Sequence, residues 1–195
     1  MRAALASLAV LAAALSPVML SSAHAGEQLV DKKGRANFGY DVVAYHTQNA
    51  AVEGTDEFSA QYNDATFLFA SAEHRDLFLA NPERFAPAYD GHCAFAIISY
   101  KKLTVDPEAF VIADPETHLP VGADYNPMTD EGILYLNYSE GVNKQFRELL
   151  PQGIVDADLA WDDCLENLPA GRARKGLRDF FGGGDRPDSC PPVTG

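Results

Sequence analysis

The sequence lacks the short motifs that mark the common catalytic centres. It contains no Gly-x-Ser-x-Gly segment, no phosphate-cradling glycine loop and no His-Glu-x-x-His pair. Three successive glycines, Gly182 to Gly184, follow no expected strand and are typical of a flexible link. We therefore expect no enzymatic activity.

Basic residues are also scarce. The chain carries 15 Lys and Arg against 28 Asp and Glu, a formal net charge of −13. This balance disfavours nucleic acid and anionic lipid as partners, because both are negatively charged. Beyond residue 25, charges or prolines interrupt every apolar run before it is long enough to span a bilayer. We expect neither nucleic-acid binding nor membrane insertion of the mature chain.

Residues 1–25 are typical of a cleaved signal peptide. Arg2 supplies a positive start, Ala3 to Leu20 is almost wholly apolar, and Ser22-Ala23-His24-Ala25 has the small-x-small pattern of a cleavage site. A membrane anchor is the alternative, but Ser16-Pro17 interrupts the short apolar core and the cleavage pattern follows at once. The sequence thus predicts a periplasmic or secreted protein.

Cysteine is rare, with only Cys93, Cys164 and Cys190. Exported proteins meet an oxidising compartment, in which paired cysteines form disulfides. We expect Cys164 to pair with Cys190 and so tie down the Pro/Gly-rich tail, which leaves Cys93 as a free thiol. The expected organisation is one domain over residues 26–150, followed by a C-terminal helix and the tail over residues 151–195.

The first part of the domain predicts a β-hairpin followed by helices. Residues 57–62 alternate in polarity, residues 65–69 are rich in aromatics, and Asn63-Asp64 between them tolerates positive φ. Ser71 is a good N-cap for a helix, and Asn81-Pro82 starts another helical turn. We expect Phe85 and Tyr89, four residues apart, to share the inner face of that turn.

The later elements follow from similar patterns. Residues 91–100 form an apolar run that fits a buried helix or a buried strand equally well. Residues 109–113 and 133–138 are predicted to form strands, and a long connection rich in Pro, Gly and Asp separates them. Ser139 caps an amphipathic helix, and a last helix is expected over residues 155–168. The predicted fold is α+β, a small antiparallel sheet, hairpin first, with helices packed on it.

Several segments of this domain resemble the YHS family. They are Gly39-Tyr40-Asp41-Val42-Val43-Ala44-Tyr45, then Phe67 to Arg75, then Asn81-Pro82-Glu83-Arg84-Phe85 and Tyr89 to Ala96. Together they look like the exported, single-domain branch of that family, and the likeness covers roughly residues 38–138.

The resemblance implies an α+β module with a metal-binding role, copper in particular. Metal-associated members carry a Phe-Cys-Ser-x-x-x-Cys-like segment where the hairpin meets the helix. The matching positions here are Phe69-Ala70-Ser71 and, close to the second cysteine, His74. Both thiolates are missing, so the resemblance does not carry a thiolate copper site over to this junction.

We take Cys93, His92, His74 and His46 as the candidate ligands of a copper or zinc ion. His92-Cys93 is the most suggestive pair, because imidazole and thiolate both suit these metals. Adjacent side chains diverge, however, so one ion can take both only if a turn presents them. The alternatives are that Cys93 is a small buried hydrophobic residue and that His74 is a hydrogen-bonded core residue.

Other interpretations stay open. His118 lies in the long connection beside several acidic residues, which would suit a solvated loop, a hard cation or a protein partner. The favoured hypothesis is an exported YHS-type module that binds or handles a transition metal. A non-metal module that binds a protein partner is the alternative, and a thiol-dependent enzyme built on Cys93 is a third.

Overall fold

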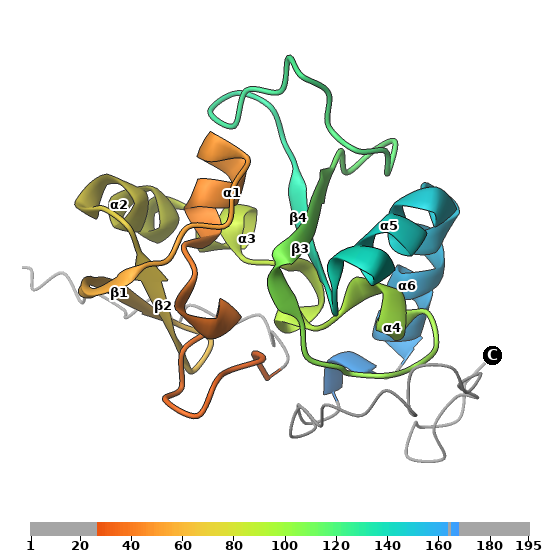
Figure 1. The fold of residues 1–195 in the computed structure, drawn as a ribbon, viewed down its shortest axis with the longest axis horizontal. Helices are drawn as coiled ribbons and strands as arrows, with labels where there is room; N and C mark the ends of the chain where they lie inside the picture. Colours follow the sequence, from red (N-terminus) through yellow and green to blue (C-terminus); the bar gives the residue numbers. More distant parts are fainter. Residues whose placement is uncertain (1–26, 164, 168–195) are drawn as a thin grey trace, which may run out of the picture.

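The computed structural model describes residues 27–163 and 165–167, so the expected signal peptide and the expected Cys164–Cys190 bridge lie outside the described residues. The chain builds two antiparallel hairpins with helices packed against them, which confirms the predicted α+β class (Figure 1). Each hairpin is a separate two-stranded sheet. None of the helices in the described part is long and apolar enough to cross a membrane.

The first hairpin pairs β1 (Thr55–Tyr62) with β2 (Ala65–Phe69). The Asn63-Asp64 turn has the positive φ angles expected for it, 47° and 59°. Helices α1 (Val42–Gln48) and α2 (Ala72–Ala80) pack on this hairpin, and α3 (Pro82–Phe85) packs against both of these helices. Phe67, Phe69 and Phe78 lie at the centre of its core. We call these five elements the first hairpin unit.

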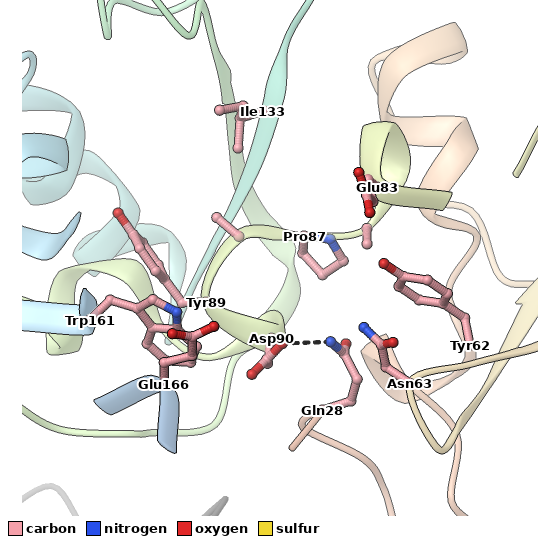
Figure 2. A pocket seen from close by; sticks show the side chains of 12 residues that line it. Gln28, Tyr62, Asn63, Glu83, Pro87, Tyr89, Asp90, Ile133, Trp161 and Glu166 are labelled. Carbon is pink, nitrogen blue, oxygen red and sulfur yellow. Dashed lines mark hydrogen bonds between the residues drawn. The ribbon is translucent and has the colours of Figure 1, made fainter. Parts of the chain in front are cut away.

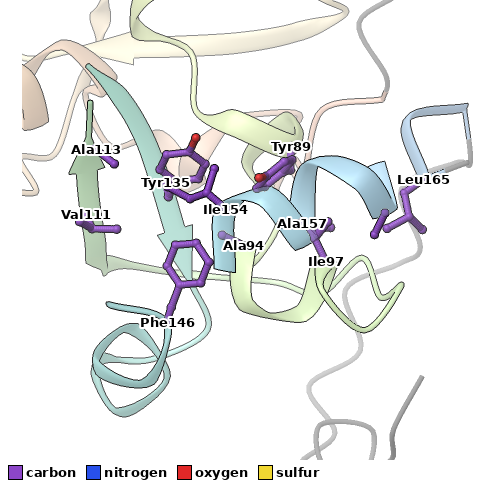
Figure 3. Close-up of a cluster of buried hydrophobic side chains, with 11 residues drawn as sticks. Tyr89, Ala94, Ile97, Val111, Ala113, Tyr135, Phe146, Ile154, Ala157 and Leu165 are labelled. Atoms are coloured by element: carbon purple, nitrogen blue, oxygen red, sulfur yellow. The ribbon is translucent and has the colours of Figure 1, made fainter. Parts of the chain in front are cut away.

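The second hairpin pairs β3 (Asp106–Ala113) with β4 (Ile133–Asn137). Its helices are α4 (Ala94–Ile97), α5 (Glu140–Leu149) and α6 (Gln152–Asp163), which share one core with the strands (Figure 3). Ser139 caps α5 as predicted, and α6 begins three residues before the expected start and is followed by a 3-10 turn, η3 (Leu165–Asn167). We call these elements the second hairpin unit.

Two short 3-10 segments lie outside these units. The segment η1 (Asn37–Gly39) precedes α1, and η2 (Ala88–Gly91) leads from the first unit into α4. Within η2, Tyr89, Asp90 and Gly91 all have left-handed backbone angles, with φ of 54°, 53° and 79°. The expected helical pairing of Phe85 with Tyr89 is therefore wrong. Phe85 packs in the first unit's core and Tyr89 in the second unit's core.

Candidate functional site

The four predicted metal ligands lie in three separate parts of the structure. His74 is on α2, His46 is on α1, and His92 and Cys93 link η2 to α4. Across residues 27–163 and 165–167, no group of three or more His, Cys, Asp or Glu side chains is placed to hold a metal ion. Each ligand candidate therefore has to be judged from its own contacts.

His74 is held by a buried carboxylate. Its Nδ1 lies 2.6 Å from Oδ2 of Asp41, which also accepts a hydrogen bond from the Ala70 amide at 2.9 Å. Asp41 caps α1 with its other oxygen, and His74 Nε2 lies 3.4 Å from the Thr47 hydroxyl. That hydroxyl donates its single proton to the Val43 carbonyl, so it is not prepared as a nucleophile. These contacts fit a core residue that joins α1, β2 and α2.

His46 is buried against the long connection between β3 and β4. Its ring packs edge-on against Phe85, and its Nδ1 lies 3.0 Å from the Tyr125 hydroxyl. Burial, with a smaller contribution from Arg84, lowers the pKa of His46 to about 4. The imidazole is thus neutral near pH 7. Its Nε2 is buried and has no hydrogen-bond partner among the described residues.

His92 and Cys93 point to different neighbours. The Nδ1 of His92 donates to the Tyr89 carbonyl at 2.9 Å, and its ring lies near Trp161. The Cys93 thiol instead faces Asn137 on β4, with Sγ 3.8 Å from Oδ1. The structure therefore does not bring this pair together around a common point.

Burial also decides the chemistry of these two groups. It lowers the pKa of His92 to about 4 and raises the pKa of the Cys93 thiol to about 11. A protonated, fully buried thiol is a poor nucleophile and a poor metal ligand. His92 keeps a free lone pair at Nε2, because its proton is on Nδ1, and this nitrogen has no partner within the described part of the chain.

His118 lies in a turn organised by Asp114. The Asp114 carboxylate accepts from the amides of Glu116 and Thr117 and from the Thr117 hydroxyl. These hydrogen bonds, led by those from Thr117, lower the pKa of Asp114. The carboxylate thus shapes the loop itself.

A pocket that the sequence did not predict lies where the two hairpin units meet. Its volume is about 270 Å³, and we call it the Asp90 pocket. Figure 2 shows Asp90 and Gln28 between Trp161 and Glu166 on one side and Tyr62 and Asn63 on the other. The lining residues are Gln28, Tyr62, Asn63, Glu83, Ala86, Pro87, Ala88, Tyr89, Asp90, Ile133, Trp161 and Glu166.

Asp90 is the buried acid of this pocket, with 8% of its surface exposed. Its Oδ1 accepts a hydrogen bond from Gln28 Nε2 at 2.7 Å, whereas its Oδ2 is buried without a partner among the described residues. Burial raises the pKa of Asp90 to about 6, and the nearby Lys102 ammonium works in the opposite direction. A buried carboxylate oxygen without a hydrogen-bond donor is energetically unfavourable, and such groups in native structures typically have a specific cause.

The backbone around Asp90 is also unusual. Tyr89 and Asp90 are non-glycine residues in the left-handed region, which few residues other than Gly, Asn and Asp adopt. The Tyr89 hydroxyl is fixed by a hydrogen bond of 2.7 Å to Asp158 on α6. Backbone strain of this kind concentrates at functional sites. The turn thus places Asp90 at the pocket, and the Tyr89 hydroxyl ties it to α6.

Comparisons with known proteins find no match: no family model, no curated protein and no solved structure is significantly similar to this chain. The YHS resemblance therefore stays a prediction.

Proposed function

We propose that this chain is an exported binding module, without catalytic activity of its own, that holds its ligand in the Asp90 pocket. Like the non-metal alternative predicted from the sequence, this proposal needs no metal ion, but that alternative expected a protein partner. The observation that carries it is Asp90, a buried acid that lines a pocket of about 270 Å³ and whose Oδ2 has no hydrogen-bond partner among the described residues. Polar groups in such a position typically serve to orient a ligand.

The composition of the pocket supports the same proposal. Segments from five parts of the chain converge on it, and they supply aromatic rings as well as a few polar groups. Pockets with these features, at the meeting of two structural units, are the usual sites of small-ligand binding.

A fragment screen by NMR tests the proposal. Small carboxylates, neutral alcohols and amides, and amines are titrated separately into the purified protein, and the indole resonance of Trp161 is followed. Trp161 is the chain's single tryptophan and lines the pocket, so its signal is unambiguous. We expect at least one class to shift this resonance with saturation. The amides of Tyr40 and Thr104, which line a different hollow, serve as the internal control. No saturable shift with any class would refute the proposal.

A transition-metal role, with copper or zinc, is the second candidate. One observation favours it: His92 donates its Nδ1 proton to a backbone carbonyl and keeps a buried, unpartnered Nε2, an arrangement typical of metal-binding histidines. The other predicted ligands lie elsewhere, so the described residues do not complete a coordination shell and His92 would be the only protein ligand identified.

Elemental analysis decides the metal candidate. The protein is purified without chelators or metal affinity, beside His92→Gln and Cys93→Ser variants. Near-stoichiometric copper or zinc that is lost in the His92 variant supports the role. No metal in any of the three proteins, and none bound on titration, contradicts it. Loss in the Cys93 variant alone would assign the ion to the thiol.

A further inference from the structure

The charge of the Asp90 pocket is one-sided. Three carboxylates line it, from Glu83, Asp90 and Glu166, and no Lys, Arg or His side chain of the described part of the chain does. Lys102 acts on Asp90 from outside the lining, and its charge favours the ionised carboxylate. One ammonium against three carboxylates leaves this region negative, which favours a cationic ligand.

The aromatic lining adds a second preference. Tyr62, Tyr89 and Trp161 all line the pocket, and the ring centroids of Tyr89 and Trp161 lie 5.5 Å apart. Aromatic faces attract ammonium groups through their quadrupole, and they do so most strongly for alkylated, weakly hydrated cations. Trp161 already holds one ammonium in this way, because Lys102 Nζ lies 4.7 Å from its ring centroid.

The same features argue against a bare metal ion. The carboxylates are not grouped closely enough to form a set of three ligands, and aromatic rings do not coordinate copper or zinc. The volume of about 270 Å³ is below the usual range for drug-sized ligands, so it suits a small head group. Asp90 lines the pocket and its Oδ2 has no donor among the described residues, so its charge can attract that group.

We propose that the Asp90 pocket binds the alkylammonium group of a small organic amine or of a lysine side chain. This inference rests on the proposed function and specifies its ligand. Asp90 supplies the buried counter-charge, Tyr62 and Trp161 supply the aromatic surface, and Glu83 and Glu166 supply negative charge at the wall.

The test compares a cation with its neutral isostere. Choline and 3,3-dimethylbutan-1-ol have the same shape but differ in charge, and each is titrated while the Trp161 indole resonance is followed. We expect choline to bind at least about tenfold more tightly, which corresponds to about 1.4 kcal/mol. We expect Asp90→Asn, which keeps an acceptor for Gln28, to abolish that preference.

Matched variants separate a local effect from a general charge effect. Glu148→Gln removes one exposed carboxylate from α5, away from the pocket, and is expected to leave choline binding unchanged. Glu83→Gln removes an exposed carboxylate that lines the pocket and is expected to weaken choline binding about twofold to fivefold, with little risk to folding. This second pair keeps the test valid if the Asp90 variant does not fold.

A further pair of probes distinguishes the two sources of ammonium. Tighter binding of Nα-acetyl-lysine methylamide than of butylamine would indicate a protein partner, and the reverse would indicate a free amine. Equal binding of choline and its isostere, or binding unaffected by both pocket variants, would overturn the inference. If neutral or anionic fragments bind and amines do not, the binding module stands and only the cation assignment fails.

Discussion

At the residue scale, the Asp41 side chain accepts several of the hydrogen bonds that hold the first hairpin unit together. Its carboxylate accepts from the amides of Val43, Ala44 and Ala70 and from His74 Nδ1, and it is fully buried. Asp41→Ala leaves these donors unpaired in the interior. We expect a loss of about 3–5 kcal/mol in the free energy of unfolding, measured by urea titration.

The Asp41 prediction has a coupled test and a control. In a double-mutant cycle with His74→Ala, the two losses should be clearly non-additive, because the side chains share one hydrogen bond of 2.6 Å. Asp76→Ala removes an exposed carboxylate on the same helix as His74 and should change stability by less than about 0.5 kcal/mol. Additive losses would show that His74 does not depend on Asp41.

His46 predicts a dependence of stability on pH. Its pKa falls from 6.5 to about 4 on folding, chiefly because of burial. Between these values the unfolded chain binds a proton that the folded chain does not, so stability decreases as pH falls through this window. We expect the wild type to lose on the order of 2–3 kcal/mol relative to His46→Gln between pH 6.5 and 4. Other groups titrate in both proteins and cancel, so a constant difference would contradict the prediction.

At the element scale, the long connection between β3 and β4 is fastened to the first hairpin unit. Arg84 on α3 donates from Nη2 to the carbonyls of Pro127 and Asp130, and Tyr125 contacts His46 on α1. In Figure 1 this connection projects beyond the end of the second hairpin. A loop of this length would otherwise be held mainly by its own turns.

Arg84→Ala should release that connection. We expect the amides of Asn126, Thr129 and Asp130 to exchange with deuterium about tenfold faster, with little change in the β-strands. Arg75→Ala, which removes a partly exposed arginine that pairs with its neighbour Asp76, is the matched control and should leave these rates unchanged. Unaltered exchange in the Arg84 variant would show that the loop is held by other contacts.

The sequence predicts the elements well wherever a local signal decides them. Asn63-Asp64 predicts the first hairpin because both residues tolerate positive φ, and Ser139 predicts a helix start because its hydroxyl accepts from Val142. The run over residues 91–100 remains undecided because an apolar segment buried on all sides has no periodicity. The left-handed turn has only a weak local signal, since Asp90 and Gly91 tolerate positive φ but Tyr89 is not typical of it.

At the scale of the whole molecule, the predicted site fails to gather for a physical reason. His92 and Cys93 are adjacent in sequence but have different neighbours: the His92 ring lies near Trp161, and the Cys93 thiol faces Asn137. Conversely, the Asp90 pocket unites residues from Gln28 to Glu166, which become neighbours only when both hairpin units are in place. No spacing in the sequence identifies such a set.

The pocket therefore depends on the junction between the units, and Tyr45 is a central part of that junction. This fully buried side chain of α1 donates a hydrogen bond of 2.8 Å to the Pro107 carbonyl on β3 and accepts one of 3.0 Å from Asn37. Its ring packs edge-on against Phe110, with ring centroids 4.7 Å apart. The hydroxyl thus links the first hairpin unit directly to the second.

Tyr45→Phe keeps the ring and removes this link. The partly buried Pro107 carbonyl loses this donor, and Asn37 Nδ2 loses its shorter acceptor but keeps the Tyr40 carbonyl at 3.4 Å, so we expect a loss of about 1–2 kcal/mol in the free energy of unfolding. Trp161 fluorescence reports unfolding of the second unit, and amide exchange in β1 and β2 reports unfolding of the first. We expect both probes to show the same loss in the free energy of unfolding, because the units unfold together. Tyr40→Phe is the control, since the Tyr40 hydroxyl has no hydrogen-bond partner among the described residues. Faster amide exchange in β1 and β2, with no change in the unfolding followed by Trp161 fluorescence, would mean that the units are independent. The Asp90 pocket would then open without unfolding of either unit.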